Sequence, residues 1–186
     1  MSNLHQVIMG NNENLKKIKN IITNKEIVRC NPIDEEISIS DNKLMITETD
    51  TLGVITYVNR KFVELSGFSK EELIGAPHSI SHHPDIPIGL YSARVKIVAS
   101  KQIWCGYVKN LCKDGKFYWS LMHMQAKLDE NGTIVGYITT RKKACPNEVE
   151  KVEQKYREFS AEEHKEHKYF MSATLRHNEH IATRVA

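Results

Sequence analysis

Two turn signals separate three β-type segments in the second half of the chain. The runs are "WCGYVKNLC", "KFYWSLMHMQAKL" and "TIVGYITTRK", and the connections between them contain Asp114-Gly115 and Asn131-Gly132. Asp-Gly and Asn-Gly are strong hairpin signals because these residues tolerate positive φ. The pattern therefore predicts three consecutive antiparallel strands.

A second pair of strands is expected upstream, separated from the first set by helices. The runs "KLMITETD" and "GVITYVNR" are joined by a turn containing Asp50 and Gly53. A helix in "NRKFVELSG" should end at Gly67, a capping box of Ser69 and Glu72 should begin the next, and Pro87 should open a third. The order predicts an α+β fold with a five-stranded antiparallel sheet and helices covering one face.

Both flanks of this central unit show helical spacing. Apolar residues of the N-terminal flank recur three and four positions apart at Leu15, Ile18, Ile21 and Ile22. We predict an amphipathic helix or cap in residues 1–35 that docks on the central unit, residues 36–145, or on a partner.

The C-terminal flank, residues 146–186, is predicted to contain a signalling helix and a tail. Its apolar residues follow a short heptad pattern at Val149, Val152, Tyr156 and Phe159. Two heptads are marginal by themselves, so the helix either pairs with its copy in a dimer or packs back on its own domain.

Composition excludes several classes of protein. The 186 residues fit one domain with additional helix, and 26 basic against 23 acidic residues give a net charge of +3 without a basic run, so we expect no nucleic-acid partner. No apolar run approaches the roughly 20 residues of a membrane-spanning helix, and no signal peptide is recognisable, so we expect a cytoplasmic protein. The four cysteines form no CxxC pair, and no catalytic motif occurs, so we expect no enzyme.

Several motifs in order carry a family resemblance. "LMITETDTLGVITYVNRKFVELSGFSKEELIGAPHSISHHPDIP", "WCGYVKNLCKDGKFYW" and "GTIVGYITTRKKA" resemble the PAS domain, specifically that of bacterial aerotaxis and energy-taxis receptors, over about 100 residues. The resemblance implies a sheet that cups a ligand against short helices, and in this subfamily the ligand is usually FAD. It also implies a sensor of redox or oxygen status that signals to a chemoreceptor or another output partner and forms a homodimer.

The resemblance also implies which residues lie near the cofactor. Matched by position and by chemistry, the candidate cofactor-binding residues are Asn59, His78, His82, His83, Asp85, Trp104, Asn110, Trp119 and His123. The chain departs from the subfamily at several of these places. His82 stands where arginine is usual, Val95 where an aromatic residue is expected, and His123 where asparagine is common.

The residues themselves leave more than one ligand open. An isoalloxazine ring needs an apolar slot with a few fixed polar groups, which the tryptophans with Asn59 and Asn110 could supply. Haem is the alternative cofactor, because His78, His82, His83 and His123 are candidate axial ligands. A ligand-free interaction module is a further alternative. Residues 60–100 contain no cysteine, which excludes a flavin-cysteine photosensor, and adjacent His82 and His83 would point in opposite directions, which disfavours a metal site.

Overall fold

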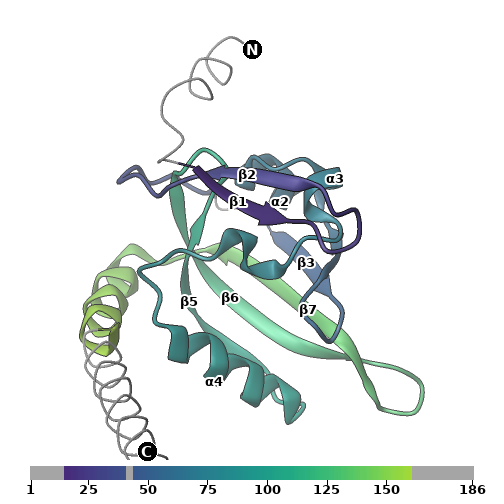
Figure 1. Cartoon of the computed structure of the whole chain (residues 1–186). Helices are drawn as coiled ribbons and strands as arrows, with labels where there is room; N and C mark the ends of the chain where they lie inside the picture. Colours follow the sequence, from purple (N-terminus) through teal and green to yellow (C-terminus); the bar gives the residue numbers. More distant parts are fainter. Residues whose placement is uncertain (1–14, 41–43, 161–186) are drawn as a thin grey trace, which may run out of the picture.

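The predicted α+β fold with a five-stranded antiparallel sheet is confirmed. The structure is a computed structural model that describes residues 15–40 and 44–160. The strand order is β4-β3-β7-β6-β5, with every neighbouring pair antiparallel (Figure 1). The strands are β3 (Met45–Thr49), β4 (Ile55–Val58), β5 (Trp104–Leu111), β6 (Phe117–Leu128) and β7 (Ile134–Lys143).

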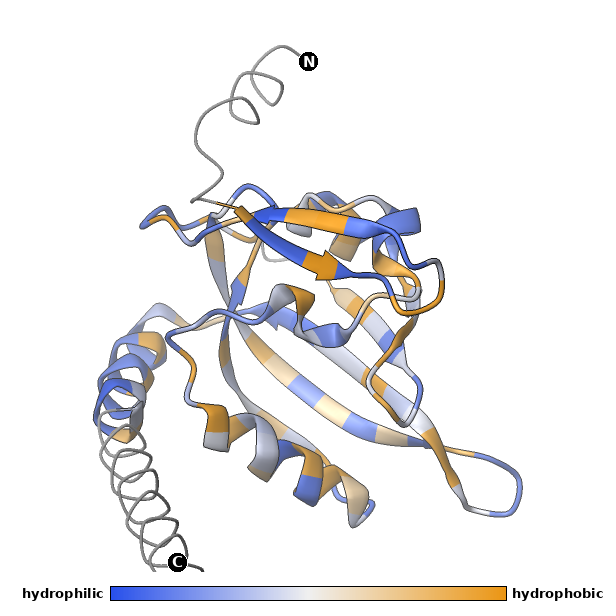
Figure 2. Cartoon of the chain, viewed as in Figure 1, coloured by the Kyte–Doolittle hydropathy of each residue, from blue (hydrophilic) through white to orange (hydrophobic). Residues whose placement is uncertain are grey.

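The two faces of the sheet have different neighbours. On the face that we name the inner face, Arg141 of β7 lies between Met45 of β3 and Met122 of β6 in the register. Helices cover this face, since the Arg141 guanidinium lies over the Phe62 ring of α2. Successive residues of a strand point to opposite sides, so hydrophilic and hydrophobic residues alternate along β6 (Figure 2). The opposite side, the outer face, contains Trp119.

Three of the four helices between the two strand sets were predicted, with the end of the first at Gly67 and the starts of the other two after Ser69 and Pro87 confirmed, whereas the 3-10 helix was not predicted. They are α2 (Arg60–Ser66), α3 (Lys70–Leu73), the 3-10 helix η2 (His78–Ser81) and α4 (Ile88–Ala99). Gly67 ends α2 with a φ of 74°, and Ser69 and Glu72 form a complete capping box before α3. Pro87 precedes α4, where its missing N–H costs no helical hydrogen bond.

The prediction of a helix from Leu15 to Ile22 is wrong. This segment forms β1 (Leu15–Lys19) and turns into β2 (Glu26–Cys30), so the N-terminal flank is an antiparallel hairpin. The turn is closed by Asn20 and Asn24, and Asn24 has a φ of 58°, which asparagine tolerates better than most residues. Ile21 and Ile22 lie in this turn and are exposed, so their spacing reflected no helical face. The rest of the predicted N-terminal segment before Leu15, residues 1–14, lies outside the described residues.

The hairpin is docked on the domain through its turn. The buried Asn20 side chain donates to the Ile74 carbonyl at 2.8 Å, and the Ile21 amide donates to the Gly75 carbonyl at 2.7 Å. Gly75 has a φ of 84°, and a Cβ there would lie 2.6 Å from Asn20 Oδ1. A two-stranded hairpin is marginal alone, so these contacts stabilise it as part of the domain.

The C-terminal helix covers residues 146–160 within the described part of the chain and packs back on its own domain. Val149, Val152 and Tyr156 contact the cluster that contains Trp119, whereas Phe159 is 61% exposed. Three of the four heptad residues therefore pack within the chain. This agrees with the interpretation in which the helix packs back on its own domain. The predicted tail from residue 161 lies outside the described residues.

Candidate functional site

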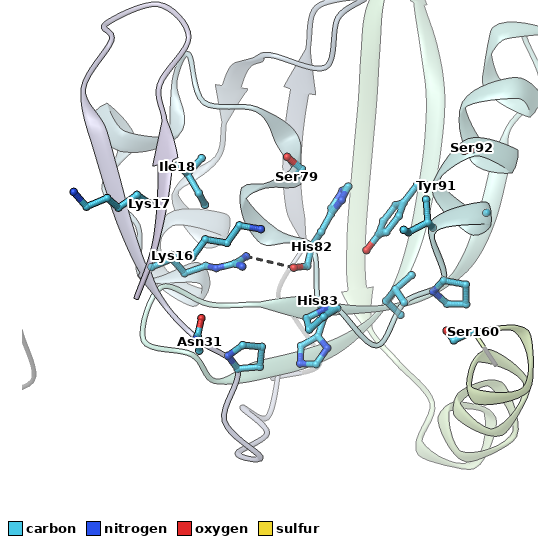
Figure 3. Close-up of a pocket in the computed structure, with 17 residues that line it drawn as sticks. Lys16, Lys17, Ile18, Asn31, Ser79, His82, His83, Tyr91, Ser92 and Ser160 are labelled. Carbon is cyan, nitrogen blue, oxygen red and sulfur yellow. Dashed lines mark hydrogen bonds between the residues drawn. The ribbon is translucent and has the colours of Figure 1, made fainter. Parts of the chain in front are cut away.

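The segment from His78 to Pro87 lies between the β1–β2 hairpin and α4 (Figure 1). It borders a cleft of about 1000 Å³, which we name the outer cleft (Figure 3). The lining comes from the hairpin with Lys16 and Arg29, from the segment with His82 and His83, and from α4 with Tyr91. The outer cleft is thus formed partly by residues far apart in the sequence.

A second, smaller cavity of about 330 Å³ lies behind this segment, and we name it the inner cavity. Thr49 and Thr139 of the sheet line it together with Arg94 of α4. Ser79, His82 and Tyr91 line both cavities. The rings of His82 and Tyr91 are stacked, with centroids 3.9 Å apart and planes 7° from parallel. This stacked pair is therefore a wall between the two cavities.

His78 is part of a buried hydrogen-bond cluster at the inner face. Its Nε2 lies 2.7 Å from Arg141 Nη2 and 3.3 Å from Thr47 Oγ1, and Arg141 Nη1 donates to Thr47 Oγ1 at 3.1 Å. A guanidinium only donates, so Nε2 accepts and the neutral ring carries its proton on Nδ1. Burial, followed by the charge of Arg141, lowers the pKa of His78 well below its usual value. His78 therefore stays neutral across the physiological range.

Arg94 is a buried cation without a counter-charge among the described residues. It is 5% exposed, forms no ion pair with any carboxylate in residues 15–40 or 44–160, and its Nε has no hydrogen-bond partner there. Its guanidinium lies over the Tyr91 ring at 5.0 Å and the Trp104 ring at 5.9 Å. Burial, with a smaller effect of Arg141, lowers the pKa of Arg94 to about 10. Uncompensated buried charge is costly, so this cavity favours a ligand with acceptor atoms.

The two adjacent histidines of the segment have different surroundings. His82 stacks on Tyr91, whereas His83 lies edge-on to Phe117 with ring centroids 5.7 Å apart. Burial, followed by the charges of Arg94 and Arg141, lowers the pKa of His82 to about 3. Burial lowers the pKa of His83 to about 4, against the opposing effect of Asp85. Both rings are neutral near pH 7, and no group of three potential metal ligands occurs in the described residues.

The other candidate residues from the sequence are dispersed around the cavities. Trp104 reaches the inner cavity region through its contact with Arg94. Asn110 is buried and donates to Ser120 Oγ at 2.9 Å, and it pairs by a β-bridge with His82. Asn59 caps α2, and its side chain forms hydrogen bonds with the backbone of Leu44 and Ile46. Its role in this structure is therefore to hold the backbone in place.

Two candidates point away from the inner cavity. Trp119 lies on the outer face, stacked on Tyr156 of the C-terminal helix at a centroid distance of 6.4 Å. His123 Nε2 lies 3.3 Å from the Cys105 sulfur, on the same outer face. Sequence reasoning did not select Tyr91 and Arg94, which line the inner cavity, or Arg141, which contacts the lining residue His78. Alternation along β7 places Arg141 on the same face as Thr139, which is the one signal that could have found it.

Asp85 connects the ligand-side segment with the outer face. Lys109 Nζ donates to Asp85 at 2.7 Å, lies 3.8 Å from Glu153 of the C-terminal helix, and sits 4.1 Å from the Phe117 ring centroid. Lys109 is 6% exposed, so it needs these carboxylates as partners. A chain of charged contacts therefore runs from the segment next to His82 and His83 to the C-terminal helix.

The inner cavity fits a flavin because buried polar atoms that line it have no hydrogen-bond partner among the described residues. Arg94 Nε and the Tyr91 hydroxyl are buried without a partner among the described residues, as is His82 Nε2. The pyrimidine edge of an isoalloxazine ring presents carbonyl oxygens and ring nitrogens, which accept hydrogen bonds from such donors. Met124 and Tyr137 supply apolar surface to the same cavity. Donors together with apolar walls are the features that a planar heteroaromatic ligand requires.

Comparison with known proteins identifies the fold family. The sequence model of a protein family, PAS, described as the PAS fold, matches residues 43–142 of this chain. The chain is 32% identical to the aerotaxis receptor of Escherichia coli (strain K12) over 123 residues, 66% of this chain but only 24% of the receptor.

Solved structures show the same architecture. The PAS domain of a protein from Colwellia psychrerythraea is 29% identical, with a TM-score of 0.51 over 54% of this chain and 86% of that one. A light-oxygen-voltage domain studied with a flavin analogue is 18% identical, with a TM-score of 0.54 over 61% of this chain and 86% of that one, and shows the fold alone. The chain belongs to the PAS family.

Proposed function

We propose that this chain is a cytoplasmic, non-enzymatic PAS sensor that binds a flavin dinucleotide and reports redox or oxygen status to a chemotaxis-type receptor or another output partner. The observation that carries the proposal is the inner cavity, with the unpartnered donors of Arg94 and Tyr91 and the unpartnered ring nitrogen of His82. Similarity to an aerotaxis receptor supports the sensory role, although the chain spans 24% of that receptor. No helix in the described residues is long and apolar enough to cross a bilayer.

In this proposal the inner cavity holds the ring and the residues around it sense its state. A bound flavin supplies reversible electron uptake, which changes charge and hydrogen bonding at its edge. Arg94 and Tyr91 donate toward that edge, and His82 lies between them and the outer cleft. Reorientation of the His82–Tyr91 pair would shift the backbone of the following residues, His83 to Asp85. Local changes of this kind can bias a two-state element.

The C-terminal helix is the proposed output element. It meets the ligand-side segment through the contacts of Lys109 with Asp85 and Glu153. A shift of Asp85 would weaken or strengthen the hold on this helix. Release of the helix would free Val149, Val152 and Tyr156 to pair with a second copy. A homodimer of the released helix is therefore part of the proposal.

A visible absorption spectrum tests the cofactor. We expect the purified chain, incubated with FAD and freed of excess ligand, to keep flavin absorbance at close to one per chain. We also expect Arg94→Met to weaken FAD binding about tenfold or more, because a hydrogen bond to a charged group contributes about 1.5–3 kcal/mol. Lys96→Met, an exposed position of the same helix, is the matched control. If the protein shows no flavin absorbance after incubation with FAD, the cofactor proposal is wrong.

Haem is the second candidate, and one observation favours it. The Nε2 atom of His82 is buried next to both cavities and has no partner among the described residues, as an axial ligand requires. His78 is a poorer candidate because its Nε2 already accepts from Arg141. An intense haem band that His82→Gln abolishes would support haem. The ligand-free alternative predicts neither spectrum.

A further inference from the structure

The β1–β2 hairpin carries two directly opposed cations on the face that meets the domain. Lys16 pairs with Arg29 in the register, so both side chains lie on one side of the hairpin, the side on which Ile27 is buried. Like charges directly opposite each other in a sheet destabilise it. Neither cation forms an ion pair with a carboxylate in residues 15–40 or 44–160. The pair therefore lacks a counter-charge in the part of the chain that the structure describes.

Arg29 is held rigidly at the edge of the outer cleft. It is 4% exposed, and its Nη1 donates to the Ile80 carbonyl at 2.7 Å and to the His82 carbonyl at 3.3 Å. Its Nε has no partner among the described residues. An arginine whose orientation is fixed by two carbonyls loses little entropy when its remaining donors bind an anion.

The outer cleft is positively charged. None of the described residues that line it is an aspartate or a glutamate. Lys16 extends toward the segment that carries Ser79 and His82, whereas Lys17 points away (Figure 3) and pairs with Glu26 at 3.0 Å. The charges of Arg29 and Lys16 also contribute to the low pKa of His82, after burial and the two inner arginines. The cationic character thus comes from Lys16 and Arg29 and reaches the wall between the cavities.

We propose that this hairpin is the diphosphate-binding part of the ligand site, with Lys16 and Arg29 contacting the phosphates of a flavin dinucleotide. The hairpin lies outside residues 43–142, the part of the chain that matches the PAS family. The inference rests on the proposed function. The ring occupies the inner cavity, and the rest of the dinucleotide passes the His82–Tyr91 wall into the outer cleft, whose volume of about 1000 Å³ exceeds that of the inner cavity threefold. Guanidinium and ammonium groups are the usual partners of phosphate oxygens.

Charge reversal on one strand tests this inference. Lys16→Glu places a carboxylate in the cleft, and Lys19→Glu makes the same change in net charge on the opposite face of β1. Both lysines are exposed, so both variants should fold. The full chain is titrated with FAD, with riboflavin, which has no phosphate, and with ADP, which carries a diphosphate without the ring. We expect Lys16→Glu to weaken FAD and ADP about tenfold, to leave riboflavin within about twofold, and Lys19→Glu to change none of them.

The three ligands separate the two proposals. If Lys16→Glu binds FAD and ADP like the unaltered chain, or if Lys19→Glu weakens them equally, the hairpin is not the diphosphate site, while riboflavin binding still supports the flavin sensor. If ADP binds in a manner that depends on Lys16 but neither flavin binds, the diphosphate site stands as a nucleotide site and the flavin sensor is wrong. Binding of none of the three overturns both proposals.

Discussion

The two flanks of the sheet dock by different kinds of contact. The β1–β2 hairpin is joined to the domain by hydrogen bonds with backbone groups of the domain, such as Cys30 amide to Lys113 carbonyl at 2.9 Å and the Asn20 side chain to Ile74 carbonyl at 2.8 Å. The C-terminal helix is held by side chains, through the Trp119–Tyr156 stack and the charges around Lys109. Backbone contacts do not depend on a ligand, whereas side-chain contacts that include Asp85 can. The hairpin is thus suited to form a fixed part of the site, and the helix to respond to it.

The largest effect should come from the anchor of the hairpin, Asn20. Its amide oxygen accepts from Ile22 and Thr23 at 3.1 and 2.9 Å, and its nitrogen donates to Ile74. Asn20→Ala leaves these buried groups unsatisfied and should lower the free energy of unfolding by about 3 kcal/mol. Chemical denaturation measures the loss. Asn131→Ala in the exposed β6–β7 turn is the control, and an equal, small effect of both changes would show that Asn20 does not anchor the hairpin.

A somewhat smaller effect is expected at the helix. Tyr156 stacks on Trp119, and its hydroxyl donates to the Tyr107 carbonyl at 2.8 Å. Tyr156→Ala should weaken helix docking by about 2 kcal/mol, the sum of an aromatic pair and a hydrogen bond. Hydrogen exchange of residues 146–160 measures it. Phe159→Ala, at the exposed position of the same helix, should leave exchange unchanged. Unaltered exchange in Tyr156→Ala would mean that other contacts hold the helix.

Acid should destabilise the ligand side first. The pKa of His82 is about 3 in the folded chain, below the usual 6.5, so the unfolded chain binds more protons below pH 6.5. Stability therefore decreases as pH falls through that value, by about 1 kcal/mol for His82 alone between about pH 7 and about pH 5.5. Thermal unfolding across this range measures the slope. His82→Gln should reduce the slope without removing it, because the pKa values of His78 and His83 are lowered in the folded chain as well. An unchanged slope in that variant would show that His82 does not contribute to the acid sensitivity.

The smallest energetic effect is expected at the contact between the two sides. The Lys109–Glu153 pair at 3.8 Å is partly exposed and should contribute less than about 1 kcal/mol in a double-mutant cycle. We propose that this pair couples the ligand-side segment to the C-terminal helix. In Glu153→Gln, the addition of FAD should no longer change hydrogen exchange of residues 146–160, whereas Glu158→Gln on the same helix should keep the response. A ligand response that survives Glu153→Gln would exclude this route.

Local sequence predicted much of the fold because turns and caps are local. The Asp-Gly and Asn-Gly turns, the capping box at Ser69 and the cap at Gly67 fixed the element boundaries without knowledge of the rest of the chain. The N-terminal flank failed because Leu15, Ile18, Ile21 and Ile22 satisfy helical spacing while two of them simply lie in a turn. Only docking of Asn20 against Ile74, more than fifty residues away, distinguishes the strand from the helix.

The site was predicted in part for a related reason. The motif around His82 and His83 marked the right segment, because both residues line the outer cleft. The motif could not show that Trp119 faces the C-terminal helix, since orientation depends on strand register. Nor could it show that Arg94 and Arg141 are both buried and form no ion pair with a carboxylate of the described residues.

The sequence by itself determined the family, the strand order of the central unit with helices between its two strand sets, and the position of the ligand-side segment, because these follow from local backbone preferences and motif spacing. The tertiary structure alone decided which face each side chain occupies, that the N-terminal flank is a hairpin, and that its cations border the cleft. Burial and charge compensation depend on residues distant in the chain, and so they are settled only when the chain is folded.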